Sequence, residues 1–212
     1  MSVSNLGRLN VYENKPDEDP RYNPKDGLKD DYKAGSKYGC LFCRSGSEER
    51  IIRDLKNSHP TLTCISPKRV RVRRQGEKET VTLFPGYIFF KTPSTVATVA
   101  PDTTVAAVDF RSIIQKSDVY RLLQYIDGKW ELCGSDLRIA MFLFEMGGVL
   151  DLSKGRFEGD TLRFISGPLK EYEDYITKID KRAKTAQVTI EFHGERIIMW
   201  LGFEIEETLK GQ

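Results

Sequence analysis

Two cysteines, Cys40 and Cys43, stand three residues apart in the run Cys-Leu-Phe-Cys, a spacing common in zinc sites and redox-active disulfides. The chain has no second pair of this spacing, and its only histidines are His59 and His193. Residues three apart in a strand point to opposite faces of a sheet, which disfavours joint ligation of one metal ion. We therefore expect neither a metal nor a cofactor, and interpret both cysteines as small buried apolar residues.

Motifs of catalysis are absent from the sequence. It contains no nucleophile elbow, no P-loop and no His-Glu-x-x-His run. The two histidines are more than a hundred residues apart, and no pattern pairs the many acidic residues. The sequence thus predicts a protein that is not an enzyme.

Phosphate binding is a third kind of chemistry, and a basic run suggests it. Six of the residues between positions 68 and 78 are Lys or Arg, against one Glu, and valine alternates with arginine before a Gln-Gly turn. This pattern predicts a two-stranded hairpin with one strongly basic strand. Its arginines at alternate positions share one face and could follow a phosphate backbone, although a merely solvated hairpin is the alternative. The candidate DNA-binding residues are Lys68, Arg69, Arg71, Arg73 and Arg74.

Composition limits the class of protein only broadly. A hydrophobic fraction of 39% and a charged fraction of 30% are typical of soluble globular proteins, and a formal net charge of +2 is too small to indicate a partner. No apolar run approaches the roughly 18 to 20 residues of a membrane helix, and the N-terminus lacks the apolar core of a signal peptide. We expect a cytoplasmic monomer without a membrane role.

The elements that position these groups begin after an N-terminal extension. Residues 1–35 combine prolines and charges with few aliphatic residues and are expected to be disordered. Residues 37–43 predict a strand. The helix that follows has Ser45 and Glu48 at capping-box spacing and ends before Pro60.

The rest of the chain divides into two predicted domains of an α+β protein. An N-terminal α/β sandwich, with an antiparallel sheet and helices, is expected over residues 36–147, a short linker over 148–157, and a small β-barrel over 158–212, where short strands alternate with tight turns. The remaining predicted elements are strands at 61–67 and 86–92, a helix and a strand within 93–109, a short helix within 117–130, and a helix that begins at N-cap Ser135 and stops at Gly147-Gly148.

Two longer segments carry a resemblance to a known family. The segments SGSEERIIRDL and PKRVRVRRQGEKETVTLFPGYIFFKT resemble the N-terminal (NGN) domain of NusG-type transcription factors, and GDTLRFISGPLKEYEDYITKIDKRAKTAQVTIEF resembles the KOW motif, an SH3-like β-barrel, that follows it. The resemblance covers residues 36 to about 207. Within the family, the chain looks most similar to specialised paralogues of the LoaP and RfaH kind.

The resemblance implies an RNA polymerase-binding surface. In this family the region around the FPGY run contributes to an apolar depression that grips the clamp helices of the largest catalytic subunit of RNA polymerase. The candidate residues carried over are Tyr38, Phe84, Pro85, Gly86 and Tyr87. Aromatic anchors in a shallow patch suit the capture of a helix, whereas Ile88 and Phe90 are expected in the core. The alternative is that all these aromatic residues belong to the core.

The KOW-like segment predicts contacts with nascent RNA, and the basic hairpin is expected near upstream DNA. The candidate RNA-binding residues are Lys178, Lys181, Arg182, Lys184, His193 and Arg196, although charged turn tips of this kind also occur without a ligand. Phe164, Ile165, Phe192 and Trp200 are expected in the barrel core. Glu171 and Asp174 replace the glycines usual in the motif, so Asp174 is expected to adopt a left-handed backbone conformation.

The sequence therefore predicts a specialised NusG-family factor that binds RNA polymerase and promotes processive elongation and antitermination, with its KOW domain on nascent RNA. One alternative is a general NusG factor whose KOW domain binds Rho or a ribosomal protein. Another is a KOW-type RNA-binding or ribosome-associated protein without a polymerase role.

Overall fold

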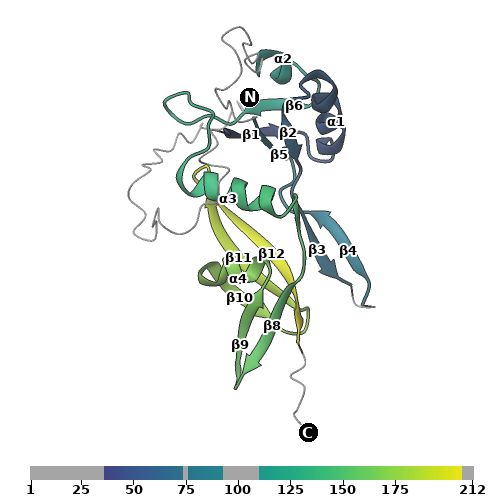
Figure 1. Ribbon diagram of the computed structural model, residues 1–212, viewed down its shortest axis with the longest axis vertical. Coiled ribbons are helices and arrows are strands. Elements are labelled where there is room, and N and C mark those ends of the chain that lie inside the picture. Colours follow the sequence, from purple (N-terminus) through teal and green to yellow (C-terminus); the bar gives the residue numbers. More distant parts are fainter. Residues whose placement is uncertain (1–35, 74–75, 93–109, 207–212) are drawn as a thin grey trace, which may run out of the picture.

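The computed structural model describes residues 36–73, 76–92 and 110–206 (Figure 1). The predicted N-terminal extension, Arg74 and the elements expected within 93–109 lie outside the described residues. The described chain has an α+β fold with three sheets. The strands are β1 (Tyr38–Cys43), β2 (Thr63–Ile65), β3 (Lys68–Val72), β4 (Lys78–Thr82), β5 (Tyr87–Lys91), β6 (Val119–Leu122), β7 (Val149–Leu150), β8 (Ser153–Glu158), β9 (Thr161–Ser166), β10 (Ile176–Asp180), β11 (Thr185–Phe192) and β12 (Glu195–Ile205). The helices are α1 (Glu48–Ser58), α2 (Phe110–Ile114), α3 (Gly134–Glu145), α4 (Pro168–Glu171) and the 3-10 helix η1 (Glu173–Tyr175).

The N-terminal sheet has the strand order β2-β5-β1-β6, with antiparallel neighbours throughout. Helices α1 and α2 cover one of its faces (Figure 1). There Ile51 and Leu55 of α1 pack with Ile88 and Phe90 of β5 in one buried cluster. Both β5 residues are at most 1% exposed, which confirms the prediction that they belong to the core.

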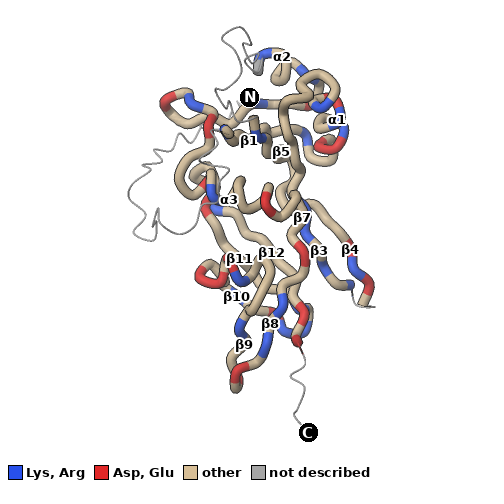
Figure 2. Tube along the Cα trace, viewed as in Figure 1, with Lys and Arg blue, Asp and Glu red and all other residues tan. Residues whose placement is uncertain are grey.

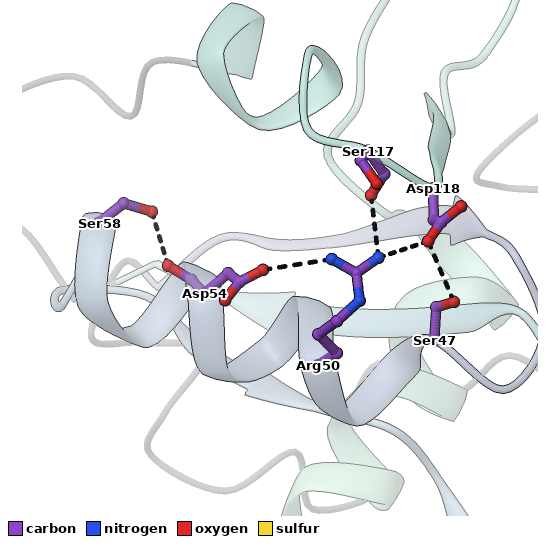
Figure 3. Close-up of polar contacts among 6 residues, drawn as sticks. All are labelled: Ser47, Arg50, Asp54, Ser58, Ser117 and Asp118. Atoms are coloured by element: carbon purple, nitrogen blue, oxygen red, sulfur yellow. Dashed lines mark hydrogen bonds and ion pairs between the residues drawn. The ribbon is translucent and has the colours of Figure 1, made fainter.

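Helix α1 is tied to the start of β6 by an ion-pair network (Figure 3). Arg50 contacts the carboxylate of Asp118 and also pairs with Asp54 at 3.5 Å. The helix is capped by Ser47 and not by Ser45, and the Ser47 hydroxyl donates to Asp118 at 3.4 Å instead of to the helix backbone. The predicted helix is therefore confirmed, but its predicted capping box is wrong.

The basic hairpin forms as predicted and lies against the C-terminal sheet. Strand β3 pairs with β4 over Lys68–Val72 and, in parallel, with β7. An ion pair of 3.0 Å joins Lys78 of β4 to Glu204 of β12, and the backbone of Val70 closely approaches Gly202. Residues 148–157, expected as a linker, contribute β7 and most of β8.

The C-terminal sheet has the order β10-β11-β12-β8-β9. Its longest strand, β12, pairs antiparallel with β11 and then, from Phe203, in parallel with β8, so the sheet curls around its inner face. Alternate residues of β11 point into this inner face and are buried, which explains the period of two in the sequence. The buried residues of β11 are Ala186, Val188, Ile190 and Phe192.

Three local predictions differ from the structure. The short helix expected within residues 117–130 is instead strand β6, whose buried Val119 and Leu122 are three apart and therefore also fit a helix. Helix α3 is capped by Cys133 and not by Ser135, while Gly147 lies just beyond its end at φ +64°, as expected of a stop signal. Asp174 lies within η1 and is not among the described non-glycine residues with positive φ.

No helix in the described ranges is long and apolar enough to cross a membrane.

Candidate functional site

The N-terminal sheet carries a cluster of aromatic side chains on the face opposite α1 and α2. Its rings contact one another: the centroids of Phe84 and Phe89 are 5.7 Å apart, and those of Phe42 and Tyr87 are 5.2 Å apart. A sheet that is apolar on both faces needs a cover on each. We call this surface the aromatic face; it consists of Tyr38, Phe42, Phe84, Tyr87 and Phe89.

The FPGY turn shapes the aromatic face between β4 and β5. Gly86 has φ +82°, and a Cβ at this position would lie 2.8 Å from the backbone oxygen of Cys43. Its N–H donates to Oε1 of Glu48 at 2.6 Å, and Glu48 is only 5% exposed. Glu48, predicted to cap its own helix, thus holds the turn against the first turn of α1, and the period of the helix gave no signal of this role.

The C-terminal sheet supplies the cover of the aromatic face. Phe192, at the end of β11, lies with its ring centroid 5.2 Å from that of Phe89, 6.2 Å from that of Tyr87 and 6.4 Å from that of Phe84. Helix α3 completes the cover, with Phe144 edge-on to Tyr38 at 5.5 Å. Phe192 is buried as predicted, but it packs on the N-terminal sheet as well as within the barrel.

The candidate polymerase-binding residues therefore differ in accessibility. Tyr38 and Phe84 are each 2% exposed and Gly86 is buried, whereas Tyr87 is half-buried and Pro85 is exposed. The structure brings Phe84, Pro85, Gly86 and Tyr87 together in one turn, whereas Tyr38 lies opposite Lys91 at the other end of the β1–β5 pair.

Sequence reasoning missed part of the accessible rim of the aromatic face, which is formed by Phe42, Tyr87 and Tyr120. Tyr120 of β6 is 58% exposed with its ring 5.7 Å from that of Phe42, and the guanidinium of Arg121 lies 5.5 Å from the centre of the Phe42 ring. The sequence predicts a helix for this segment, whereas its antiparallel pairing with β1 brings these residues beside Phe42.

A buried carboxylate fastens the turn between β11 and β12 to α3. Asp136 is 1% exposed and accepts hydrogen bonds from the Tyr125 hydroxyl at 2.7 Å and from the backbone N–H of His193 at 3.0 Å. The His193 ring stacks on Tyr125 with centroids 5.0 Å apart, and its buried Nε2 has no hydrogen-bond partner among the described residues. Burial raises the pKa of Asp136, and burial beside this carboxylate raises the pKa of Tyr125, so the phenol remains a donor.

The candidate RNA-binding residues fall into two separate groups. Lys178, Lys181, Arg182 and Lys184 are exposed around the turn between β10 and β11. His193 and Arg196 lie beyond the other end of β11, and a strand of its eight residues spans roughly 25 Å. His193 is further engaged with Asp136, so the predicted set is not one cluster.

Other side chains of the barrel also differ from expectation. Phe164 is buried as predicted, but Ile165 is 37% exposed. Trp200 is half-buried and alternates with the buried Met199 and Leu201, so it lies on the outer face of β12. Lys181 lies 4.9 Å from the ring centre of Phe157, a partly exposed aromatic residue that the sequence did not single out.

Strand β3 of the basic hairpin carries Lys68, Arg69 and Arg71, and Arg73 follows directly after it. Figure 2 shows the basic charge along β3. Arg69 is partly buried, and burial next to Arg71 lowers its pKa. Arg71 and Arg73 both contact Glu79 of β4, while Lys68 pairs with Glu49 of α1 at 2.6 Å. The arginine face thus carries more positive than negative charge among the described residues.

Cys40 and Cys43 lie in different core clusters, on opposite faces of the N-terminal sheet. Burial, with Glu48 nearby, raises the pKa of the Cys43 thiol to about 11, so it is held as the thiol. Within the described ranges, no three His, Cys, Asp or Glu side chains are grouped so that they could hold a metal ion.

Comparison with known proteins bears on the N-terminal part of the chain. Residues 36–125 match the family described as transcription termination factor nusG. No curated protein sequence matches the chain. A solved structure titled "Domain interaction in Thermotoga maritima NusG" is similar at 17% identity and a TM-score of 0.46, covering 79% of this chain and 93% of that chain. The matched segment contains β1 to β6, the basic hairpin and every residue of the aromatic face. Over this segment, residues 36–125, the chain is similar to the nusG family of transcription factors.

Proposed function

We propose that this protein binds RNA polymerase through its aromatic face and promotes processive elongation and antitermination, while its C-terminal domain contacts nascent RNA. The observation that carries the proposal is the aromatic face itself: five clustered aromatic residues on one side of a sheet within the segment matched to the nusG family. Aromatic anchors in a shallow apolar surface are suited to hold a helix, here the clamp helices of the polymerase.

The cover over the aromatic face sets a condition on this binding. Tyr38 and Phe84 are buried beneath Phe192 and α3, so a helix can reach them only after the turn between β11 and β12 leaves the sheet. Before that, a partner meets only the rim, formed by Tyr87, Phe42 and Tyr120. Polymerase binding and the covered state therefore compete, and the partner must bind the open state more tightly to shift the equilibrium.

We propose two domains with one short connection: residues 36–147, a connection at 148–157, and residues 158–212. The proposal is supported by two sheets of different strand composition and by the polar contact at Asp136, which joins them through few hydrogen bonds. The two parts meet through the rings around Phe192, the Asp136 carboxylate and the Lys78–Glu204 ion pair, and no described strand of 36–147 pairs with one of 158–206, so they can separate without loss of either sheet.

Binding is tested with the full chain and a bacterial RNA polymerase. Tyr87→Ala should weaken binding, because Tyr87 belongs to the rim and is accessible in the covered state. Ile198→Ala is the matched control, since Ile198 is 55% exposed on β12, away from the aromatic face. Equal affinities of the two variants would contradict a polymerase contact at this face and favour an RNA-binding protein without a polymerase role.

Activity is tested by single-round transcription through an intrinsic terminator, on templates with and without the native upstream leader. Readthrough that rises only with the leader supports antitermination directed by nascent RNA. Unchanged termination on both templates, despite polymerase binding, would instead indicate a general elongation factor whose C-terminal domain binds protein partners such as Rho or a ribosomal protein.

A further inference from the structure

One carboxylate joins two arginines on the basic hairpin. Glu79 of β4 lies directly opposite Arg71 of β3 in the strand register. Arg73 donates to it twice, from Nε at 2.6 Å and from Nη2 at 2.9 Å. Arg71 contacts the same carboxylate through Nε at 3.2 Å and Nη2 at 3.1 Å. Both guanidinium groups are thus held by a single side chain.

Fold stability is a weak reason for this arrangement. The side chains of Arg71 and Arg73 are 44% and 58% exposed, and ion pairs in water contribute little to the free energy of unfolding. The hydrogen bond from Arg73, with help from Arg71, lowers the pKa of Glu79 to about 2, so the carboxylate is charged at neutral pH. It is a permanent anchor for the two arginines.

The contacts leave part of each guanidinium available. Both arginines use Nε and Nη2 toward Glu79, and a guanidinium has five N–H donors, so among the described residues the two donors of Nη1 remain on each. Arg69 lies on the same face of β3 next to Arg71, and their mutual repulsion contributes to the lowered pKa of Arg69. Three guanidinium groups against one carboxylate form a surface that favours an anion.

We propose that Glu79 is a positioning residue that holds Arg71 and Arg73 ready to donate to the phosphate backbone of a nucleic acid. The inference rests on the proposed function, because a protein bound to a transcribing polymerase lies close to DNA and RNA. The physical reason is preorganisation: two long side chains that are already ordered lose less freedom when a phosphate binds.

If Glu79 acted through its charge alone, it would weaken the binding of a phosphate and not strengthen it. A carboxylate near a phosphate repels it, so its removal should strengthen binding if Glu79 were only a surface ion-pair partner. Positioning predicts that its removal weakens binding, although the net charge of the hairpin becomes more positive. The sign of the change therefore decides between the two roles.

The test measures the affinity of the full chain for a labelled duplex DNA and for single-stranded RNA of the same sequence, by fluorescence anisotropy over a range of salt concentrations. Glu79→Gln removes the charge, and Glu79→Asp keeps the charge but shortens the reach to both arginines. Glu77→Gln is the matched control: Glu77 is exposed on the same hairpin, and its backbone oxygen accepts from the Arg73 N–H at 2.8 Å. Urea unfolding of each variant verifies that the fold is retained.

We expect Glu79→Gln and Glu79→Asp each to weaken binding about fivefold, while Glu77→Gln leaves it equal or slightly stronger. The nucleic acid whose affinity falls in the Glu79 variants, duplex DNA or single-stranded RNA, is the one that supplies the phosphates. Stronger binding by Glu79→Gln, or unchanged binding by Glu79→Asp, would overturn the positioning role. Arg71→Ala with Arg73→Ala separates this failure from a wider one: if that double variant binds normally, the hairpin is not a nucleic-acid contact at all.

Discussion

The ring of Phe192 lies 5.2 Å from the ring of Phe89, which joins the inner face of the C-terminal sheet to the second face of the N-terminal sheet. Both residues belong to one continuous buried cluster that includes Val188 and Leu201 of the barrel and Tyr38 of β1. The surface expected to bind polymerase is therefore also an internal packing surface. The exposure of this surface depends on how strongly Phe192 packs against it.

Substitution of Phe192 by Ala should lower the free energy of unfolding by about 3 to 5 kcal/mol, because it removes a fully buried aromatic ring. Phe157→Ala removes the same group from a side chain that is 38% exposed, so a much smaller loss is expected. Urea denaturation followed by circular dichroism measures both. Similar losses in the two variants would mean that Phe192 does not hold the two sheets together as described.

Substitution of Gly86 by Ala should destabilise the FPGY turn more than the same change at Gly76. The two glycines have nearly equal φ angles, +82° and +84°, so the left-handed backbone costs each alanine about 1 to 2 kcal/mol. A Cβ at Gly86 would also lie 2.8 Å from the backbone oxygen of Cys43, whereas nothing lies within 4 Å at Gly76. Thermal and urea unfolding should therefore give a clearly lower free energy of unfolding for Gly86→Ala than for Gly76→Ala. An equal loss of stability in the two variants would contradict the close approach of Gly86 to Cys43.

Local patterns predict part of this fold well. The Val-Arg alternation of β3 predicts the hairpin because strand period and exposure coincide there. The apolar run of β5 predicts a doubly covered strand, and Ile88 and Phe90 are buried as expected. These elements depend on neighbours in sequence, so the sequence is sufficient for them.

Long-range contacts account for most of what the sequence does not predict. Glu48 has the spacing of a capping residue but accepts from Gly86, because the FPGY turn places the Gly86 N–H 2.6 Å from this buried carboxylate. His193 and Arg196 appear close to the basic turn in sequence, yet β11 carries them to the far end of the barrel. The cover of the aromatic face depends on how two sheets meet, which no local period encodes.

The stability of the contact at Asp136 should depend on pH in a defined direction. Burial raises the pKa of this carboxyl in the folded chain above its unfolded value of about 3.9. The folded state then binds more protons than the unfolded state between these two pKa values, so stability falls as pH rises through that window. Ionised Asp136 is compensated by the Tyr125 hydroxyl and the His193 N–H, with Glu191 as an opposing charge.

Asp136→Asn isolates this term because the amide does not titrate. The free energy of unfolding of the wild-type chain, minus that of the variant, should increase as the pH is lowered from about 6 toward 4. Urea denaturation at several pH values provides the comparison, and the other carboxylates cancel in the difference. A difference that stays constant, or that shrinks on acidification, would show that the pKa of Asp136 is not raised.

The proposed RNA contact implies unequal roles for the two separate basic groups of the C-terminal sheet. Lys178, Lys181 and Arg182 are exposed around one turn, whereas Arg196 lies roughly 25 Å away at the other end of β11. A short RNA hairpin bound at the first turn reaches only the first group. Lys181→Ala should therefore weaken binding and reduce the slope of log affinity against log salt by about 0.7, the value for one phosphate contact on a single strand.

Arg196→Ala removes one charge as well and serves as the control, with little change expected. Anisotropy titrations of the full chain with a leader RNA over a range of salt concentrations measure both slopes. If the two variants lose affinity equally, the RNA responds to the net charge of the domain, and the turn between β10 and β11 is not a specific site.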